Sequence, residues 1–239
     1  MGADQVAAFI AETVMGTGGI IVPPPGYYQR IAEICKKYDV LFIDDEVICG
    51  FGRTGDKMFG IEHWPGVTPD VMTLAKGITS GYVPLGAAVF SAPIFEALKS
   101  RDRFFHGFTY SGHPLACRVG LENLKILEEE KLKDRAALMG KRLLQGLQSI
   151  GAEAIGEVRG MGLMVGVELV QDRKKKHKFV FPLAPRVVEI AYEKGLITRP
   201  LAGDILQFSP PLVITEEEID IIIEIIGPAV DAAYREACI

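Results

Sequence analysis

The chain has 239 residues, enough for one large domain or two smaller ones with a substantial hydrophobic core. With 49% hydrophobic and 24% charged residues it has the composition of a soluble globular protein, and no apolar run approaches the length of a membrane span. The net charge of -5 gives no reason to expect nucleic acid or an anionic membrane surface as the main partner.

The first half of the chain is predicted to alternate short buried strands with a helix and loops. Residues 6–14 form an apolar strand candidate with Glu12 near its end, and the apolar spacing over residues 27–38 is helical. Further strands are predicted at residues 40–43, 71–74 and 85–90. Apolar runs of this length, bounded by turn residues, are typical of buried parallel strands.

The second half has a different pattern. Residues 115–150 form a long, charged stretch with the apolar spacing of a helix. A segment with its own strands and helices follows. Thr215 and Glu218 form a capping box at the start of its last helix. The strands are predicted at 162–169, 196–198 and 206–208, and the helices at 185–194 and 216–226. We therefore expect a sheet-rich region over 1–114, a connecting helical region over 115–150 and a small α+β domain over 151–239.

Charged residues end two of the predicted strands. Asp44 and Asp45 close the first, and Lys76 lies just past the second. In open α/β sheets, ligands bind outside the carboxyl ends of the strands. A lysine amine and a carboxylate at that edge are the groups that pyridoxal phosphate requires, one for its Schiff base and one for its ring nitrogen. Adjacent strand residues face opposite ways, so only one aspartate can point at the ligand.

A glycine pattern offers an alternative from another class of enzyme. Gly50, Gly52 and Gly55 match the dinucleotide fingerprint, and Asp70 follows at the spacing of the ribose contact, as in an NAD-dependent oxidoreductase. The residues after Gly55 have no helical period, and Asp70 precedes a strand instead of ending one. We favour a glycine-rich surface loop.

The motifs as a whole resemble one family. The segments FIDDEVICGFGRTG (42–55) and PDVMTLAKG (69–77) are similar to the signature of class III aminotransferases, which are pyridoxal-phosphate enzymes of fold type I. The segment HGFTYSGHP (106–114) resembles the ω-amino acid:pyruvate transaminase branch, and 159–164 and 198–200 resemble small-domain motifs. The resemblance implies an α/β fold: part of a large domain with a mixed or parallel sheet, plus a small C-terminal α+β domain.

The resemblance also implies the cofactor contacts. Lys76 is the Schiff-base lysine, Asp45 the partner of the ring nitrogen, and Val47 a packing residue against one face of the ring. Thr109 contacts the cofactor phosphate of a neighbouring subunit, which implies a homodimer with shared active sites.

The implied substrate contacts lie elsewhere in the chain. Arg199 binds the substrate carboxylate, for which a guanidinium offers a matching fork of donors. Glu12, followed by Thr13 where the family has proline, lies near the cofactor and in some members pairs with that arginine.

The resemblance covers the second half of a family member, since members are roughly twice as long as this chain. The expected function is transfer of an amino group between an ω-amino acid or amine and pyruvate or a similar keto acid. The alternative within the family is a truncated, catalytically weak or inactive fragment.

The remaining features predict neither a metal nor a polyanion as partner. Four scattered cysteines without a C-x-x-C pair indicate reduced thiols in a cytoplasmic protein, and the four histidines lack metal-ligand spacing. The basic run at residues 173–178 is typical of a solvated loop in an acidic chain.

Overall fold

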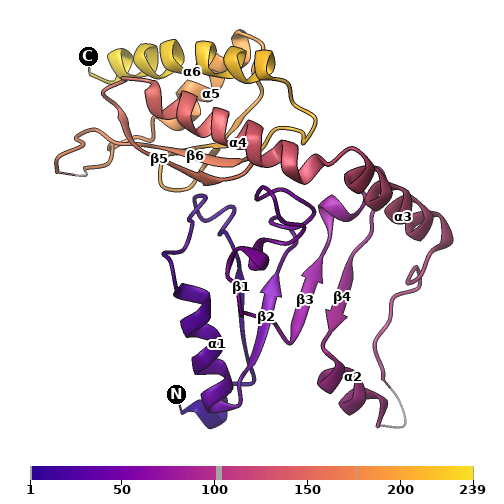
Figure 1. The fold of residues 1–239 in the computed structure, drawn as a ribbon. Coiled ribbons are helices and arrows are strands. Elements are labelled where there is room, and N and C mark those ends of the chain that lie inside the picture. The colour runs from indigo at the N-terminus through magenta and orange to yellow at the C-terminus, as the bar shows by residue number, and fades with distance from the viewer. Residues whose placement is uncertain (1, 101–103, 176, 239) are drawn as a thin grey trace. The chain divides into compact units, whose positions relative to one another are not determined.

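The computed structural model describes residues 2–100, 104–175 and 177–238 (Figure 1). The chain divides into two compact units, and each unit is made of segments that are not contiguous in the sequence. The first unit comprises Met1–Thr13, Pro23–Arg53 and Lys57–Lys131, and the second comprises Val14–Val22, Thr54–Asp56 and Leu132–Ile239.

The first unit is built on a mixed sheet. Its strand order is β1-β2-β3-β4; the first three strands are parallel and β4 is antiparallel to β3. The strands are β1 (Ala8–Glu12), β2 (Leu41–Asp45), β3 (Val71–Leu74) and β4 (Ala87–Phe90), and the helices are α1 (Tyr27–Tyr38), α2 (Ala92–Lys99) and α3 (Pro114–Glu129). Three short 3₁₀ helices, η1 (Ala3–Gln5), η2 (Gly60–His63) and η3 (Lys76–Ile78), complete the unit.

Helix α1 covers one face of this sheet through aromatic packing. The ring of Tyr28 stacks on Phe42 of β2 with centroids 5.9 Å apart and meets Trp64 edge-on at 5.0 Å. Because side chains alternate along a strand, this is also the face of Asp44. The opposite face is more open, and Ile10 of β1 is 57% exposed there. The two aspartates therefore have different surroundings.

The second unit is built on an antiparallel sheet with the order β5-β6-β8-β7. Helices α4, α5 and α6 pack with it around one apolar core (Figure 1). The elements are α4 (Leu132–Ser149), β5 (Ile155–Met161), β6 (Met164–Leu169), α5 (Ala184–Glu193), β7 (Arg199–Leu201), β8 (Ile205–Phe208) and α6 (Glu216–Ala237). The capping box at α6 is confirmed: Glu218 N donates to Thr215 Oγ1 and Thr215 N donates to Glu218 Oε2.

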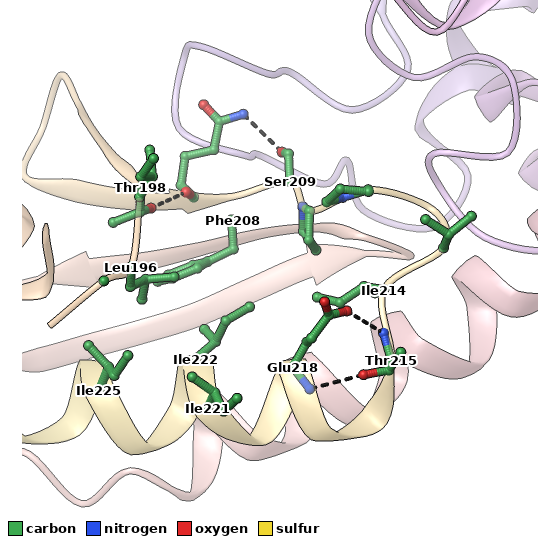
Figure 2. Close-up of a pocket in the computed structure, with 16 residues that line it drawn as sticks. Leu196, Thr198, Phe208, Ser209, Ile214, Thr215, Glu218, Ile221, Ile222 and Ile225 are labelled. Carbon is green, nitrogen blue, oxygen red and sulfur yellow. Dashed lines mark hydrogen bonds between the residues drawn. The ribbon is translucent and has the colours of Figure 1, made fainter.

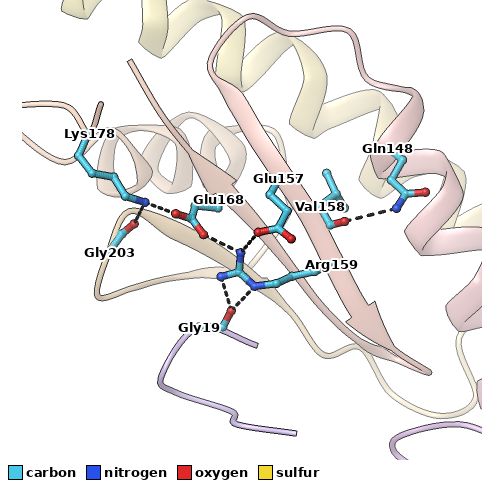
Figure 3. Close-up of polar contacts among 8 residues, drawn as sticks. All are labelled: Gly19, Gln148, Glu157, Val158, Arg159, Glu168, Lys178 and Gly203. Carbon is cyan, nitrogen blue, oxygen red and sulfur yellow. Dashed lines mark hydrogen bonds and ion pairs between the residues drawn. The ribbon is translucent and has the colours of Figure 1, made fainter. Parts of the chain in front are cut away.

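Arg159 of β5 fixes the early segment Val14–Val22 in the second unit (Figure 3). Its Nε and Nη2 both donate to the carbonyl oxygen of Gly19, at 3.0 and 2.7 Å. Its Nη1 pairs with Glu157 and Glu168, and Glu168 in turn pairs with Lys178. The Arg159 side chain is largely buried and therefore loses most of its hydration. The two carboxylates and the carbonyl oxygen replace the lost water as hydrogen-bond acceptors for its guanidinium.

The fold class predicted from the sequence is confirmed, but several elements differ. Residues 115–150 form two helices, because Lys131 adopts a left-handed backbone (φ 52°) between α3 and α4. The predicted strand at 196–198 is wrong: the strand is Arg199–Leu201. Strand β5 and helix α2 were not predicted.

No helix in the part of the chain that the structure describes is long and apolar enough to span a membrane. Within the same residues, no group of three or more acidic, histidine or cysteine side chains is placed to hold a metal ion. The basic run at 173–178 is described except for Lys176, and Lys178 in it pairs with Glu168 and donates to Gly203 O at 2.9 Å.

Candidate active site

Three polar side chains form a row at one edge of the first sheet. Glu12 pairs in register with Asp45, and Asp45 pairs with Thr73. The strands that carry them are parallel, so their carboxyl ends meet at one edge and residues in register point to the same face. This edge is where ligands bind in open α/β sheets.

Asp45, not Asp44, is the aspartate of this row. Its carboxylate is partly exposed and accepts the backbone N–H of Val47 at 3.1 Å. This local bond fixes the turn after β2 and places Val47 beside the carboxylate. Asp44 lies on the opposite face and is fully buried. Of the two adjacent aspartates, Asp45 therefore lies on the face of the polar row and Asp44 on the buried face.

Lys76 follows β3 after a single residue and begins η3. Its side chain is exposed, and among the described residues none makes a hydrogen bond or ion pair with its amine. Its backbone has φ 44°, in the left-handed region that residues with a Cβ seldom occupy. Backbone strain of this kind is concentrated at functional sites.

Asn123 of α3 supports the turn that carries Lys76. Its Nδ2 donates to the carbonyl oxygens of Gly77 and Ile78 at 2.9 and 3.2 Å, and its Oδ1 accepts from Ser80 Oγ at 2.6 Å. Sequence reasoning missed this residue. The signal available was an amide side chain on the buried stripe of a helix, next to Gly120 and Leu127.

We expect the Asn123→Asp variant to loosen the Lys76 turn, because a carboxylate cannot donate to the two carbonyls. The free energy of unfolding should fall by about 1–3 kcal/mol, the cost of leaving buried polar groups unpaired. Urea denaturation measures this effect. Glu128→Gln, an exposed change on the same helix, is the control and should cost less than about 0.5 kcal/mol.

The glycine-rich segment after β2 does not open a helix. Residues 47–59 form turns and bends, and the next regular element is the short η2. Asp70 accepts the backbone N–H of Phe42 at 2.8 Å, so its carboxylate serves the sheet. The helix that a dinucleotide fingerprint needs is absent at this position, and the oxidoreductase interpretation is not supported.

Two predicted site residues are not part of this row. Thr109 is exposed in the segment between α2 and α3. Arg199 is exposed on β7 of the second unit, where its Nε donates to Gln207 Oε1 at 2.7 Å. Gln207 Nε2 donates in turn to Ser209 Oγ at 3.1 Å.

A pocket of about 600 Å³ lies within the second unit (Figure 2). Residues 195–198 and 207–211 form one side, and Ile221, Ile222 and Ile225 of α6 form the other. Its walls are mainly apolar, and its polar groups largely satisfy one another: Thr198 Oγ1 donates to Gln207 O, and Thr215 and Glu218 form the capping box. No residue of the Glu12–Asp45–Thr73 row lines it.

The sheet edge carries the carboxylates of Glu12 and Asp45 and the hydroxyl of Thr73, and the exposed Lys76 follows β3 after one residue. These groups can hold a protonated ring nitrogen and form a covalent bond to an aldehyde. They are the chemical requirements of a pyridoxal phosphate site.

The curated proteins similar to this chain include several transaminases. The putrescine–pyruvate aminotransferase of Pseudomonas aeruginosa is 45% identical over 234 residues, which are 97% of this chain and 51% of that protein. The diaminobutyrate–2-oxoglutarate transaminase of Halomonas elongata is 43% identical, over 100% of this chain and 53% of that protein. This chain therefore spans about half the length of the curated relatives it matches.

Solved structures give the same result. An (S)-enantioselective ω-transaminase from Thermomicrobium roseum has a TM-score of 0.92 and 48% identity, covering 97% of this chain and 52% of that one. The ω-transaminase of Pseudomonas jessenii in complex with PMP has a TM-score of 0.93 and 45% identity, covering 99% of this chain and 53% of that one. The family model for class III aminotransferases matches residues 1–230. The chain belongs to the class III aminotransferase family.

Proposed function

We propose that this chain carries the lysine and ring-binding part of a pyridoxal-phosphate-dependent transaminase. The reaction would move an amino group between an ω-amino acid or amine and pyruvate or a similar keto acid. The observation that carries the proposal is the pairing of Asp45 with Thr73 on one face of the sheet, with the exposed Lys76 amine just beyond β3. The putrescine–pyruvate and ω-transaminase relatives support this substrate class.

The residues at the edge fit the cofactor. The hydroxyl of Thr73 is buried and has no hydrogen-bond partner among the described residues, so it is available to a ligand beside Asp45. Asp45 offers a carboxylate that is only locally hydrogen-bonded. When bound, pyridoxal phosphate supplies an aldehyde that reacts with amines and a ring that accepts electrons released at the substrate carbon.

Each residue then has a defined role in the proposal. Lys76 Nζ would bond to the cofactor, be displaced by the substrate amine, and carry the proton at the substrate carbon. Asp45 would hold the proton on the ring nitrogen, because an opposite charge favours the protonated ring. Val47 would pack against a face of the ring.

The proposed substrate site uses Arg199 and Glu12. Arg199 has five N–H donors, and its contact with Gln207 is to a neutral amide, so it can bind a carboxylate without breaking a charged pair. Thr109 would contact the cofactor phosphate in a neighbouring subunit, which makes a homodimer the proposed working unit.

The proposed compartment is the cytoplasm. All four cysteines are free thiols, as expected in a reducing environment. A γ-aminobutyrate transaminase of Solanum lycopersicum that is 41% identical to this chain is mitochondrial, which is also a reducing compartment.

One alternative has a specific observation in its favour. The relatives are about twice as long as the aligned region, so groups that complete the site can lie in the half that this chain does not match. A weak or inactive fragment is therefore the second candidate.

The test is a titration with pyridoxal phosphate, followed by borohydride reduction and peptide mapping. A specific site predicts that the peptide with Lys76 is labelled to saturation at low cofactor concentration, whereas exposed lysines such as Lys99 are labelled in proportion to concentration. Saturable labelling together with pyruvate-dependent turnover supports the transaminase. Saturable labelling without turnover supports the fragment, and proportional labelling everywhere contradicts a cofactor site.

A further inference from the structure

Two carboxyl groups are buried behind the candidate site. Asp44 and Glu46 are both fully inaccessible to solvent. Asp44 lies in register between Ala11 of β1 and Met72 of β3, neither of which offers a side-chain donor. Neither oxygen of its carboxyl has a hydrogen-bond donor among the described residues. A buried carboxylate in this position would be uncompensated, which is costly.

Glu46 is only half satisfied. Its Oε1 accepts the backbone N–H of Ile61 at 2.8 Å and the hydroxyl of Thr13 at 3.4 Å. Its Oε2 is buried and has no donor among the same residues. Glu46 N donates to Thr73 O and so continues the ladder of β2, and residues two apart along a strand point to the same face, which places the Asp44 and Glu46 carboxyls on one side. A hydrogen bond between the two carboxyls raises the pKa of Asp44 and lowers that of Glu46. A single proton between them would satisfy an oxygen of each.

The surroundings indicate which group holds the proton. Burial and the charge of Glu46 raise the pKa of Asp44 to about 9. Burial raises the pKa of Glu46 as well, but the N–H groups of Gly60 and Ile61 limit that rise by favouring the charged form. Asp44 is thus the acid of the pair and Glu46 the carboxylate.

We propose that Asp44 and Glu46 share one proton at neutral pH, with the Asp44 carboxylic acid donating to Glu46 Oε2. The pair is a positioning element for the candidate site. Through Glu46 it joins the end of β1 at Thr13, the end of β2, and the start of η2 at Ile61. Gly60 shows how closely these segments approach, because a Cβ there would lie 2.2 Å from Thr13 Oγ1.

The consequence for cofactor binding rests on the proposed function. Asp45 lies between the two members of the pair in sequence and faces the other side of the sheet. A neutral Asp44 leaves the Asp45 carboxylate without a second charge on the preceding residue. Because the pair also joins the ends of β1 and β2 to η2 through Glu46, it fixes the backbone from which the Asp45 carboxylate would contact a ring nitrogen.

The shared proton also makes stability depend on pH. The titratable groups whose charge acts on Asp44 are Glu46 on the same face, Asp45 on the opposite face of the strand, and Tyr28 on α1, which has Cys49 and Glu12 near it. Burial raises the pKa of Tyr28 well above its usual range, so it stays neutral. Between the unfolded pKa of Asp44, 3.8, and the folded value of about 9, the folded chain holds one more proton than the unfolded chain. The contribution of Asp44 to stability therefore falls as pH rises through this window.

The first experiment is infrared spectroscopy of the chain near neutral pH without cofactor. Wild type should show the carbonyl stretch of a protonated carboxylic acid, Asp45→Asn should keep it, and Asp44→Asn should lose it. Absence of the band in wild type, or its persistence in Asp44→Asn, overturns the proposal. Because no cofactor is used, this result does not depend on the proposed transaminase function.

The second experiment separates positioning from simple packing. Asn at position 44 can still donate to Glu46, whereas Ala cannot. We expect the backbone amide of Ile61 to exchange with solvent at least about tenfold faster in Asp44→Ala than in Asp44→Asn. We also expect the urea midpoint to fall more steeply from about pH 5 to about pH 8 in wild type than in Asp44→Asn. Equal exchange rates in the two variants would overturn the positioning role, and parallel pH profiles of wild type and Asp44→Asn would overturn the shared proton.

Discussion

Replacing Lys76 with glycine is expected to abolish cofactor attachment and at the same time stabilise the fold. Glycine has no amine, so the borohydride-fixed label at position 76 should disappear, and loss of proton transfer alone should lower any turnover by about 10²–10⁴-fold. The backbone at this position has φ 44°, which costs a residue with a Cβ about 1–2 kcal/mol and costs glycine little. The greater conformational entropy of glycine in the unfolded chain offsets part of this gain, so the free energy of unfolding should rise by about 0.5–1 kcal/mol. Labelling, turnover and urea denaturation measure the three effects.

A matched substitution distinguishes backbone strain from removal of surface charge. Lys125 is an exposed lysine inside α3, where the backbone is helical. Lys125→Gly should destabilise the chain by about 1 kcal/mol and leave the labelling of Lys76 unchanged. If both glycine variants shift stability in the same direction, Lys76 is not strained. If saturable labelling of the chain by pyridoxal phosphate persists in the Lys76→Gly variant, another lysine is the nucleophile.

The largest stability loss that we expect from adding one methyl group is at Gly140 of α4. A Cβ at this position would lie 2.2 Å from the backbone C and O of Gly162, in the turn between β5 and β6. The obstacle is backbone, so the helix and the hairpin would have to move apart. Gly140→Ala should therefore lower the free energy of unfolding by about 1–3 kcal/mol or more, despite the better helix propensity of alanine.

Gly146 on the same helix provides the control. A Cβ there would lie 2.0 Å from the end of the flexible Ile223 side chain, which can turn to another rotamer. We expect Gly146→Ala to change stability by less than about 1 kcal/mol, because the gain in helix propensity offsets the repacking. Thermal or urea unfolding of both variants tests the prediction. A loss at Gly146 as large as that at Gly140 would show that helix packing as a whole, and not the backbone contact, is limiting.

The sequence predicted elements well where local signals agreed with tertiary packing. The helix over Tyr27–Tyr38 and the strand over Val71–Leu74 have the predicted bounds, since apolar periodicity and turn residues coincide there. Helix α6 was predicted to stop at residue 226 but continues to Ala237 through Pro228. Its last turns bury Ala229, Val230 and Ala233, and this packing overrides the helix-breaking signal.

The missed elements lack such local signals. Strand β5 contains Gly156, Glu157, Arg159 and Gly160, a composition typical of a loop. Its pairing with β6 and the contacts of Arg159 with Glu168 and the Gly19 carbonyl, all of which depend on the tertiary fold, hold it as a strand. The break between α3 and α4 falls at Lys131, where no glycine or proline marks it. Strand β7 includes Pro200, which a sheet accepts because β7 is an edge strand.

The same distinction applies to the candidate site. Asp45 and Lys76 could be predicted because each directly follows or ends an apolar run at the same edge of the sheet. The contacts of Asn123 and of Glu46 could not, because their partners lie 15 to 46 residues away and only the tertiary fold brings them together. The roles of all the site residues in binding and catalysis, which are Glu12, Asp45, Val47, Lys76, Thr109 and Arg199, remain predictions.

The contact between Arg159 and Gly19 also has a consequence for synthesis of the chain. The two residues are 140 positions apart, so at about 5–20 residues per second the ribosome needs about 7–28 s to make the arginine after the glycine. During that time Ile20, which is fully buried in the finished structure, has no strand β6 to pack against at Gly166. Residues 14–22 therefore stay without their buried surroundings until Arg159 and strand β6 have been made, so this segment cannot reach its native packing earlier in synthesis.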